Sequence, residues 1–181
     1  MHTDPHLPPV FTRAEATQYG LTRHQADHRA RSGHWVTLCR GTYAEASAFA
    51  RRPATEQHAL RAVAVLGARA DDASASHVTA ASLRGWSLPL EHPVQPWITR
   101  GDLRRSARHD RHVVVQVATL PATETARARV EVDGWTWTVG TTGPARTAAD
   151  CLRHLPLGEG VALVDSALRI GDVSSDEVRS C

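Results

Sequence analysis

The sequence predicts an α+β protein in two modules, a winged helix-turn-helix over residues 1–52 and a small α+β domain over residues 53–181. Two capping boxes ten residues apart predict a pair of short helices near the N-terminus. β-forming residues follow them at once and predict a hairpin. Later helix and strand patterns come in blocks rather than in strict alternation, which favours the α+β class.

The two N-terminal helices are predicted from their caps. Thr12 is followed three residues later by Glu15, and Thr22 by Gln25. In such a box the Thr hydroxyl accepts from the third helical amide, while the longer side chain accepts from the amide of the cap residue. Gly20 lies between the boxes and suits the left-handed conformation that ends a helix. This arrangement is typical of a helix-turn-helix.

A short hairpin completes the first module. Gly33 ends the second helix, residues 35–38 and 42–44 predict two strands, and residues 39–41 form the tip between them. A helix-turn-helix followed directly by a hairpin predicts a winged helix. The Pro-rich residues before it are expected to be an extended lead-in, and residues 45–53 a linker.

The second predicted helix has a small face and a polar face. Ala26 and Ala30 share one side of the helical wheel and can pack close to the first helix. The polar side carries cations and amide donors, as a helix that reads the DNA major groove does. The predicted DNA-binding residues are Arg23, His24, Gln25, His28 and Arg31 on this helix, with Arg40 at the hairpin tip. The alternative is a solvated helical hairpin with a basic outer face.

The overall charge limits how DNA can be bound. The 181 residues carry 21 basic and 19 acidic side chains, a formal net charge of +2. This balance excludes a protein coated in nucleic acid, so any contact depends on local clustering. Residues 1–52 have seven Arg against four acidic residues, a local excess of three.

Cysteine use and hydropathy favour a cytoplasmic protein. Cys39, Cys151 and Cys181 are an odd number without a CxxC spacing, which argues against a disulfide framework or a thiolate zinc site. No apolar run approaches the roughly 18 residues of a membrane span, and the N-terminus lacks the pattern of a signal peptide. No cofactor is predicted.

The second module is predicted from caps, turns and β-branched runs. Asp133-Gly134 between β-formers predicts a hairpin, and Pro144 opens a helix at its first position. The predicted helices are residues 55–68 capped by Thr55, residues 77–84 capped by Ser76, and residues 144–155 and 157–170. The predicted strands are residues 94–99, at an edge because of Pro96, and residues 113–117, a buried strand, with a polar loop over residues 100–112.

The C-terminal residues carry two further expectations. The apolar positions of the 157–170 helix are expected to be buried against the strands around Val113 and Val139. Ser174 and Glu177 form another capping box, but a single turn nucleates poorly. Residues 172–181 are therefore predicted to be frayed and exposed.

Five segments together resemble the AbiEi antitoxin family of type IV toxin–antitoxin systems. No single segment is specific, but the ordered set covers most of residues 11–170. The segments are Gly20-Leu21-Thr22-Arg23, Ser32-Gly33-x-Trp35, Arg40-Gly41-x-Tyr43, the SHxTAAxLxGW stretch from Ser76 to Trp86, and the TxPARTxxD-like stretch from Thr141 to Asp150.

The resemblance implies an N-terminal winged helix and a C-terminal α+β antitoxin domain. It also implies repression of the protein's own promoter, and neutralisation of a nucleotidyltransferase-like toxin without tight direct contact. Longer relatives begin with an additional helix, and many actinobacterial relatives continue into a restriction-endonuclease-like domain. The sequence is therefore similar either to a short member or to the N-terminal part of a longer relative.

Three patterns point weakly to other chemistry. Glu131-x-Asp133 resembles a metal-binding nuclease pair, but the chain has no Lys to accompany it, and a hairpin turn explains Asp-Gly. His24 and His28 share a helix face where a metal can bind, but no acidic or thiolate ligand is near in sequence, so DNA contacts are favoured.

The third pattern is a combination of residue types found in hydrolases. Ser76-His77 with Asp150 suggests one, but the G-x-S-x-G elbow is missing. The residues thus predict a non-enzymatic, DNA-binding transcriptional regulator. The alternative is the DNA-targeting or scaffold part of a restriction-endonuclease-like protein whose catalytic domain lies outside this chain.

Overall fold

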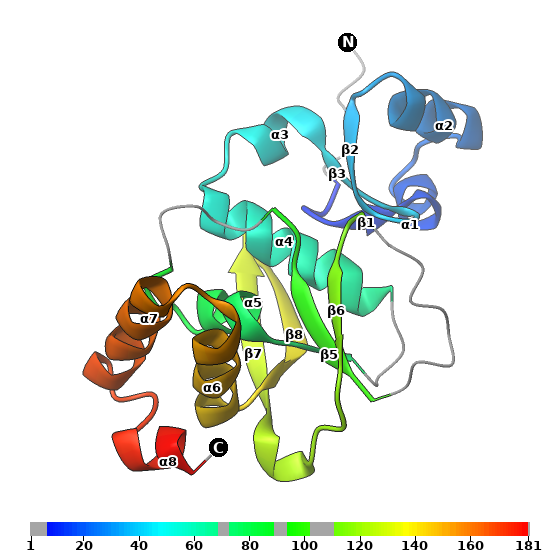
Figure 1. Cartoon of the computed structure of the whole chain (residues 1–181). Coiled ribbons are helices and arrows are strands. Elements are labelled where there is room, and N and C mark those ends of the chain that lie inside the picture. Colours follow the sequence, from blue (N-terminus) through cyan, green and yellow to red (C-terminus); the bar gives the residue numbers. More distant parts are fainter. Residues whose placement is uncertain (1–6, 69–72, 89–93, 102–110, 181) are drawn as a thin grey trace.

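The structure is a computed structural model that describes residues 7–68, 73–88, 94–101 and 111–180. The winged helix-turn-helix is present at its N-terminal end (Figure 1). Its three strands form an antiparallel sheet in the order β1-β3-β2, so the predicted hairpin gains a third strand from the end of the lead-in. The elements are β1 (Phe11–Thr12), α1 (Arg13–Gln18), α2 (Arg23–Arg31), β2 (Trp35–Cys39) and β3 (Thr42–Glu45).

The segment predicted as a linker is a helix. Residues 46–50 form α3 (Ala46–Ala50), and the Glu45 carboxylate caps it by accepting from the amides of Ser47 and Ala48 at 3.2 and 2.7 Å. Phe49 on α3 is 5% exposed and joins the main hydrophobic core. The prediction was wrong because this short helix is stabilised by that long-range contact more than by its own sequence pattern.

A five-stranded mixed sheet forms the centre of the second half, in the order β6-β5-β4-β8-β7. The predicted hairpin is confirmed, with Asp133 and Gly134 at φ +51° and +78° in the turn. The strand predicted over residues 94–99 at an edge was placed wrongly: it begins only after Pro96 and lies between two other strands. The strand predicted over residues 113–117 as buried is instead a half-buried strand at the edge of the sheet. The strands are β4 (Ala73–Ala75), β5 (Trp97–Arg100), β6 (Val114–Val117), β7 (Thr125–Val132) and β8 (Trp135–Thr142).

The helices of the second half match their predicted ranges closely. Thr55 lies inside its helix, which Pro53 precedes at the cap position, so the predicted Thr55 cap was wrong. No helix in the described part of the chain is long and apolar enough to cross a membrane. Most of the predicted polar loop, residues 102–110, lies outside the described residues. The helices are α4 (Ala54–Gly67), α5 (His77–Leu83), the 3₁₀ turn η1 (Ala122–Glu124), α6 (Pro144–His154), α7 (Leu157–Arg169) and α8 (Ser175–Arg179).

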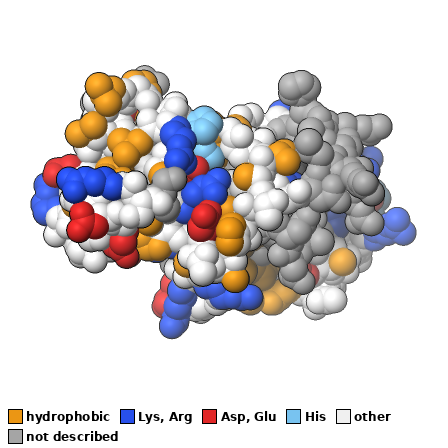
Figure 2. Space-filling view, turned by 60° about the horizontal axis from the view of Figure 1, so that its bottom comes forward, with side chains coloured by type: hydrophobic (Ala, Val, Ile, Leu, Met, Phe, Trp, Pro, Cys, Tyr) orange, Lys and Arg blue, Asp and Glu red, His pale blue; other side chains and the backbone are white. Residues whose placement is uncertain are grey.

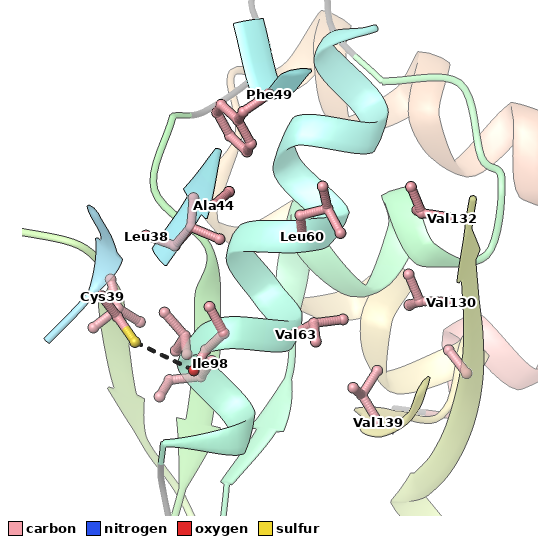
Figure 3. Packing of buried hydrophobic residues seen from close by; sticks show 14 residues of the cluster. Leu38, Cys39, Ala44, Phe49, Leu60, Val63, Ile98, Val130, Val132 and Val139 are labelled. Atoms are coloured by element: carbon pink, nitrogen blue, oxygen red, sulfur yellow. Dashed lines mark hydrogen bonds between the residues drawn. The ribbon is translucent and has the colours of Figure 1, made fainter. Parts of the chain in front are cut away.

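The main hydrophobic core crosses the predicted module boundary. Helix α4 packs between the N-terminal hairpin and the strands β7 and β8 (Figure 3). Leu38 and Cys39 of β2 are buried in this core, and the Cys39 thiol donates to the carbonyl oxygen of Ala64 on α4 at 3.2 Å. The boundary after residue 52 stays a prediction, but apolar packing is continuous across it.

A second core holds the C-terminal helices, and it corrects two expectations. The buried side of α7, including Leu163, packs against α5 and α6 rather than against the strands around Val113 and Val139. Val173 is 6% exposed in the same core, and the Trp86 indole donates to Asp172 at 2.8 Å. The prediction of an exposed tail was therefore wrong for these residues, because their partners lie far away in sequence.

Candidate nucleic-acid interface

The two N-terminal helices are held by the predicted caps. Thr12 donates its amide to the Glu15 carboxylate at 2.7 Å, and Thr22 donates its amide to the Gln25 side-chain oxygen at 2.8 Å. Both Thr hydroxyls accept from the amide three residues on, which completes the capping boxes. Gly20 between the helices has φ +96°, a backbone conformation that residues other than Gly rarely adopt. The turn that orients α2 is thus encoded locally.

An aromatic cluster supports α2 from behind. Phe11 and Trp35 meet edge to face with ring centroids 4.8 Å apart, and Trp35 lies 5.6 Å from Tyr43. Ala26, the predicted inward residue of α2, is 1% exposed and packs into this cluster together with Leu21. Large rings below a small helix face let α2 lie close to the sheet while its other face stays in solvent.

Arg13 links α1 to α2 through an ion pair. Arg13 on α1 forms an ion pair with Asp27 on α2 at 3.0 Å, and its guanidinium lies 5.5 Å from the ring centroid of Tyr43. The acidic residue of α2 is therefore paired toward α1. The outward charge of α2 comes from its Arg side chains.

The residues predicted to contact DNA are all exposed. His24, His28 and Arg31 make no ion pair and no side-chain hydrogen bond with another described residue, so they are available to a ligand. Gln25 differs, because its oxygen is held by the cap and only its NH₂ group remains to donate. The exposed set is Arg23, His24, Gln25, His28 and Arg31 on α2, with Arg40 at the hairpin tip.

The structure adds His34 to this surface. Its ring lies 6.4 Å from that of His28 between centroids, and its Nδ1 atom is 2.7 Å from the Ser32 hydroxyl. A helical wheel did not find it because it follows Gly33, outside the helix. Within the described residues, no group of three or more His, Cys, Asp or Glu side chains converges as a metal site would require.

Arg40 lies apart from the α2 residues, at a groove. Gly41 at φ +81° turns the hairpin here, and Arg40 is exposed beside it. The groove has a volume of about 960 Å³ and lies between the hairpin tip, the end of α4 and the strands β7 and β8. Arg40 therefore faces a surface built partly by the second half of the chain.

A second polar cluster lies at the start of α5. His77 is 3% exposed and has φ +50°, and its Nδ1 and Nε2 atoms lie 2.9 Å from the Ser76 hydroxyl and 3.2 Å from Nδ1 of His154. Burial lowers the pKa of His77 to about 4; Asp150 opposes this effect, while His154 and Arg146 add to it. Since Ser76 is 0% exposed, the cluster offers no accessible nucleophile to a hydrolase.

Two of the segments that carry the family resemblance meet beside this cluster. Arg146 donates to Asp150 at 2.9 Å, as its i+4 spacing predicts, and also to Glu124 at 2.6 Å. Arg84 donates to the carbonyl oxygen of Thr142 at 2.9 Å. The face at the bottom of Figure 1 gathers Arg, acidic and His side chains (Figure 2). Arg146 and Arg84 are thus engaged within the protein, and their contacts join β8, α5, α6 and the turn at Glu124.

The two carboxylates that resemble a nuclease pair are engaged elsewhere. Glu131 pairs with Arg129 on the same strand at 3.1 Å, and Asp133 forms an ion pair with Arg52. Arg52 also pairs with Glu56 at 3.2 Å. The hairpin turn and these ion pairs explain both residues without a metal.

Comparison with known proteins finds a family match in the N-terminal segment. Residues 7–46 match the family described as transcriptional regulator, AbiEi antitoxin. The match spans β1 to β3 and ends at the first residue of α3, so it covers the whole winged helix-turn-helix. No curated protein matches the chain. The match confirms the resemblance to the AbiEi antitoxin family over residues 7–46, and the matching family is one of transcriptional regulators.

Proposed function

We propose, from the match of residues 7–46 to the AbiEi antitoxin regulators, that the chain binds duplex DNA at its own promoter and represses it. The observation that carries the proposal is the outward face of α2, where His24, His28 and Arg31 are exposed and form no ion pair or side-chain hydrogen bond with another described residue. Imidazole and guanidinium donors on a helix of nine residues suit the base edges of the major groove. Action on a promoter implies a cytoplasmic protein.

The proposal includes the antitoxin role and assigns no reaction to the chain. The functional partner would be a nucleotidyltransferase-like toxin that the chain neutralises without tight contact. The antitoxin role is supported by the match to a family of antitoxin regulators. The lack of an assigned reaction is supported by the burial of His77 and Ser76, which are not open to a substrate. A growth assay tests this part: the product of the neighbouring gene should arrest growth alone, and co-expression of this chain should restore it.

The DNA-binding part is tested by replacing His24, His28 and Arg31 together by Ala. Every specific interaction with DNA that these substitutions remove should cost about 1–3 kcal/mol of binding free energy on the promoter duplex. The fold should be unaffected, because the three side chains point away from the buried Ala26.

The matched control removes charge elsewhere, by replacing Arg169 and Arg179 with Ala. These side chains are 71% and 78% exposed on α7 and α8, outside the matched segment. Fluorescence anisotropy with promoter and scrambled duplexes compares all variants. A triple variant that binds the promoter as tightly as the parent would show that α2 is not the reading helix.

A further inference from the structure

The groove beside the hairpin tip brings together two Arg from opposite halves of the chain. Arg40 comes from the tip and Arg127 from β7, and both line the groove and are exposed. Neither forms an ion pair or a side-chain hydrogen bond with another described residue. Two available cations on one groove form a local positive surface that the balanced overall charge of the chain conceals.

The described lining residues include one carboxylate beside the two Arg, so their formal net charge is +1. Glu15 is the acidic side chain among them, and its Oε2 atom accepts from the amide and the hydroxyl of Thr12 at 2.7 and 2.9 Å. The positive end of α1 offsets this carboxylate further. Ser74 and Gly140 also line the groove, where Gly140 is the register partner of Arg127 and packs closely against Ser74.

The groove adjoins the proposed DNA-reading surface through α1. Thr12 and Glu15 at the start of α1 line it, and the Arg13–Asp27 ion pair holds this same turn against α2. Duplex DNA carries about one negative charge per 1.7 Å of its axis, so a duplex on α2 presents phosphates well beyond the bases that α2 reads. A cationic groove alongside has the charge to bind that backbone.

We propose that the phosphate backbone of the bound duplex follows this groove, and that Arg127 contacts a phosphate flanking the sequence read by α2. The inference rests on the proposed function and extends it, because it assigns DNA contact to the second half of the chain. Arg127 acts on the backbone only, so it adds affinity without sequence preference.

The test compares Arg127→Gln with Arg129→Gln. Arg129 is the matched control: it lies two residues along β7 on the same face of the strand, is 69% exposed, and pairs with Glu131 away from the groove. Arg127→Gln should weaken binding to promoter and scrambled duplexes by the same factor. It should also reduce the salt slope of the binding constant by about 1. Arg127→Lys should restore the slope, and Arg129→Gln should leave it unchanged.

Hydroxyl-radical footprinting on the promoter gives a second readout. Arg127→Gln should lose backbone protection on one flank and keep it where α2 binds. If Arg127→Gln matches Arg129→Gln in slope and footprint while the parent still prefers its promoter, the groove inference is wrong and the proposed function stands. A parent that binds both duplexes equally would refute promoter recognition instead, and a parent that binds neither would refute both.

Discussion

The buried His77 makes stability depend on pH in a defined window. Its pKa is about 4 in the folded chain, against 6.5 for an ordinary His. Above pH 6.5 it is neutral in both states, and as the pH falls toward 4 only the unfolded chain takes up the proton. The free energy of unfolding should therefore fall by up to about 3 kcal/mol across this window, at 1.36 kcal/mol per pKa unit.

The assay is urea unfolding at several pH values between 6.5 and about 4 for the parent and His77→Asn. Asn tolerates the left-handed backbone of this position but does not titrate, so the variant should be less stable at neutral pH and its stability should decline less on acidification. His24→Asn, at an exposed position on α2, should retain the parent's decline. Parallel curves for the parent and His77→Asn would refute the assignment of a buried neutral imidazole.

Two further predictions concern DNA binding and the C-terminal core. With a local excess of three Arg in residues 1–52, log K for promoter DNA should fall with log salt at a slope of about −3 to −5; anisotropy titrations giving a slope near zero would contradict DNA binding. Val173→Ala should cost about 2 kcal/mol of unfolding free energy, because Val173 is 6% exposed in the second core. Val161→Ala, at 51% exposure, should cost less than about 0.5 kcal/mol, and equal losses in urea unfolding would mean that Val173 is not packed.

The parts of the fold that were predictable are those whose causes are local. Both capping boxes, the Gly20 turn and the Asp133-Gly134 hairpin depend on residues within a few positions of one another, and each was predicted from the sequence. Strand β1 is only two residues long and forms by pairing with β3, some thirty residues later. Such an element has no periodicity from which to be predicted.

The candidate site divides in the same way. The outward face of α2 follows from helical spacing, so the exposure of His24 and His28 agrees with the wheel, although their contact with DNA stays a prediction. Arg127 lies far from the hairpin in sequence, and only the packing of both halves around α4 brings it to the groove of Arg40. The proximity of Arg127 to the groove of Arg40 could therefore not be predicted from the sequence, because it depends on the tertiary structure.

The shared core limits how the two halves can move relative to each other. Leu38 and Phe49, from the hairpin and from α3, are 0% and 5% exposed against α4, and the Cys39 thiol donates to an α4 carbonyl. Separating the halves would expose these side chains, at about 1.5–3 kcal/mol for each large one. A loose linker would allow the hairpin to move relative to β7, whereas this core opposes such motion. The core therefore opposes relative motion of Arg40 and Arg127, as the proposed path of the DNA backbone along the groove would require.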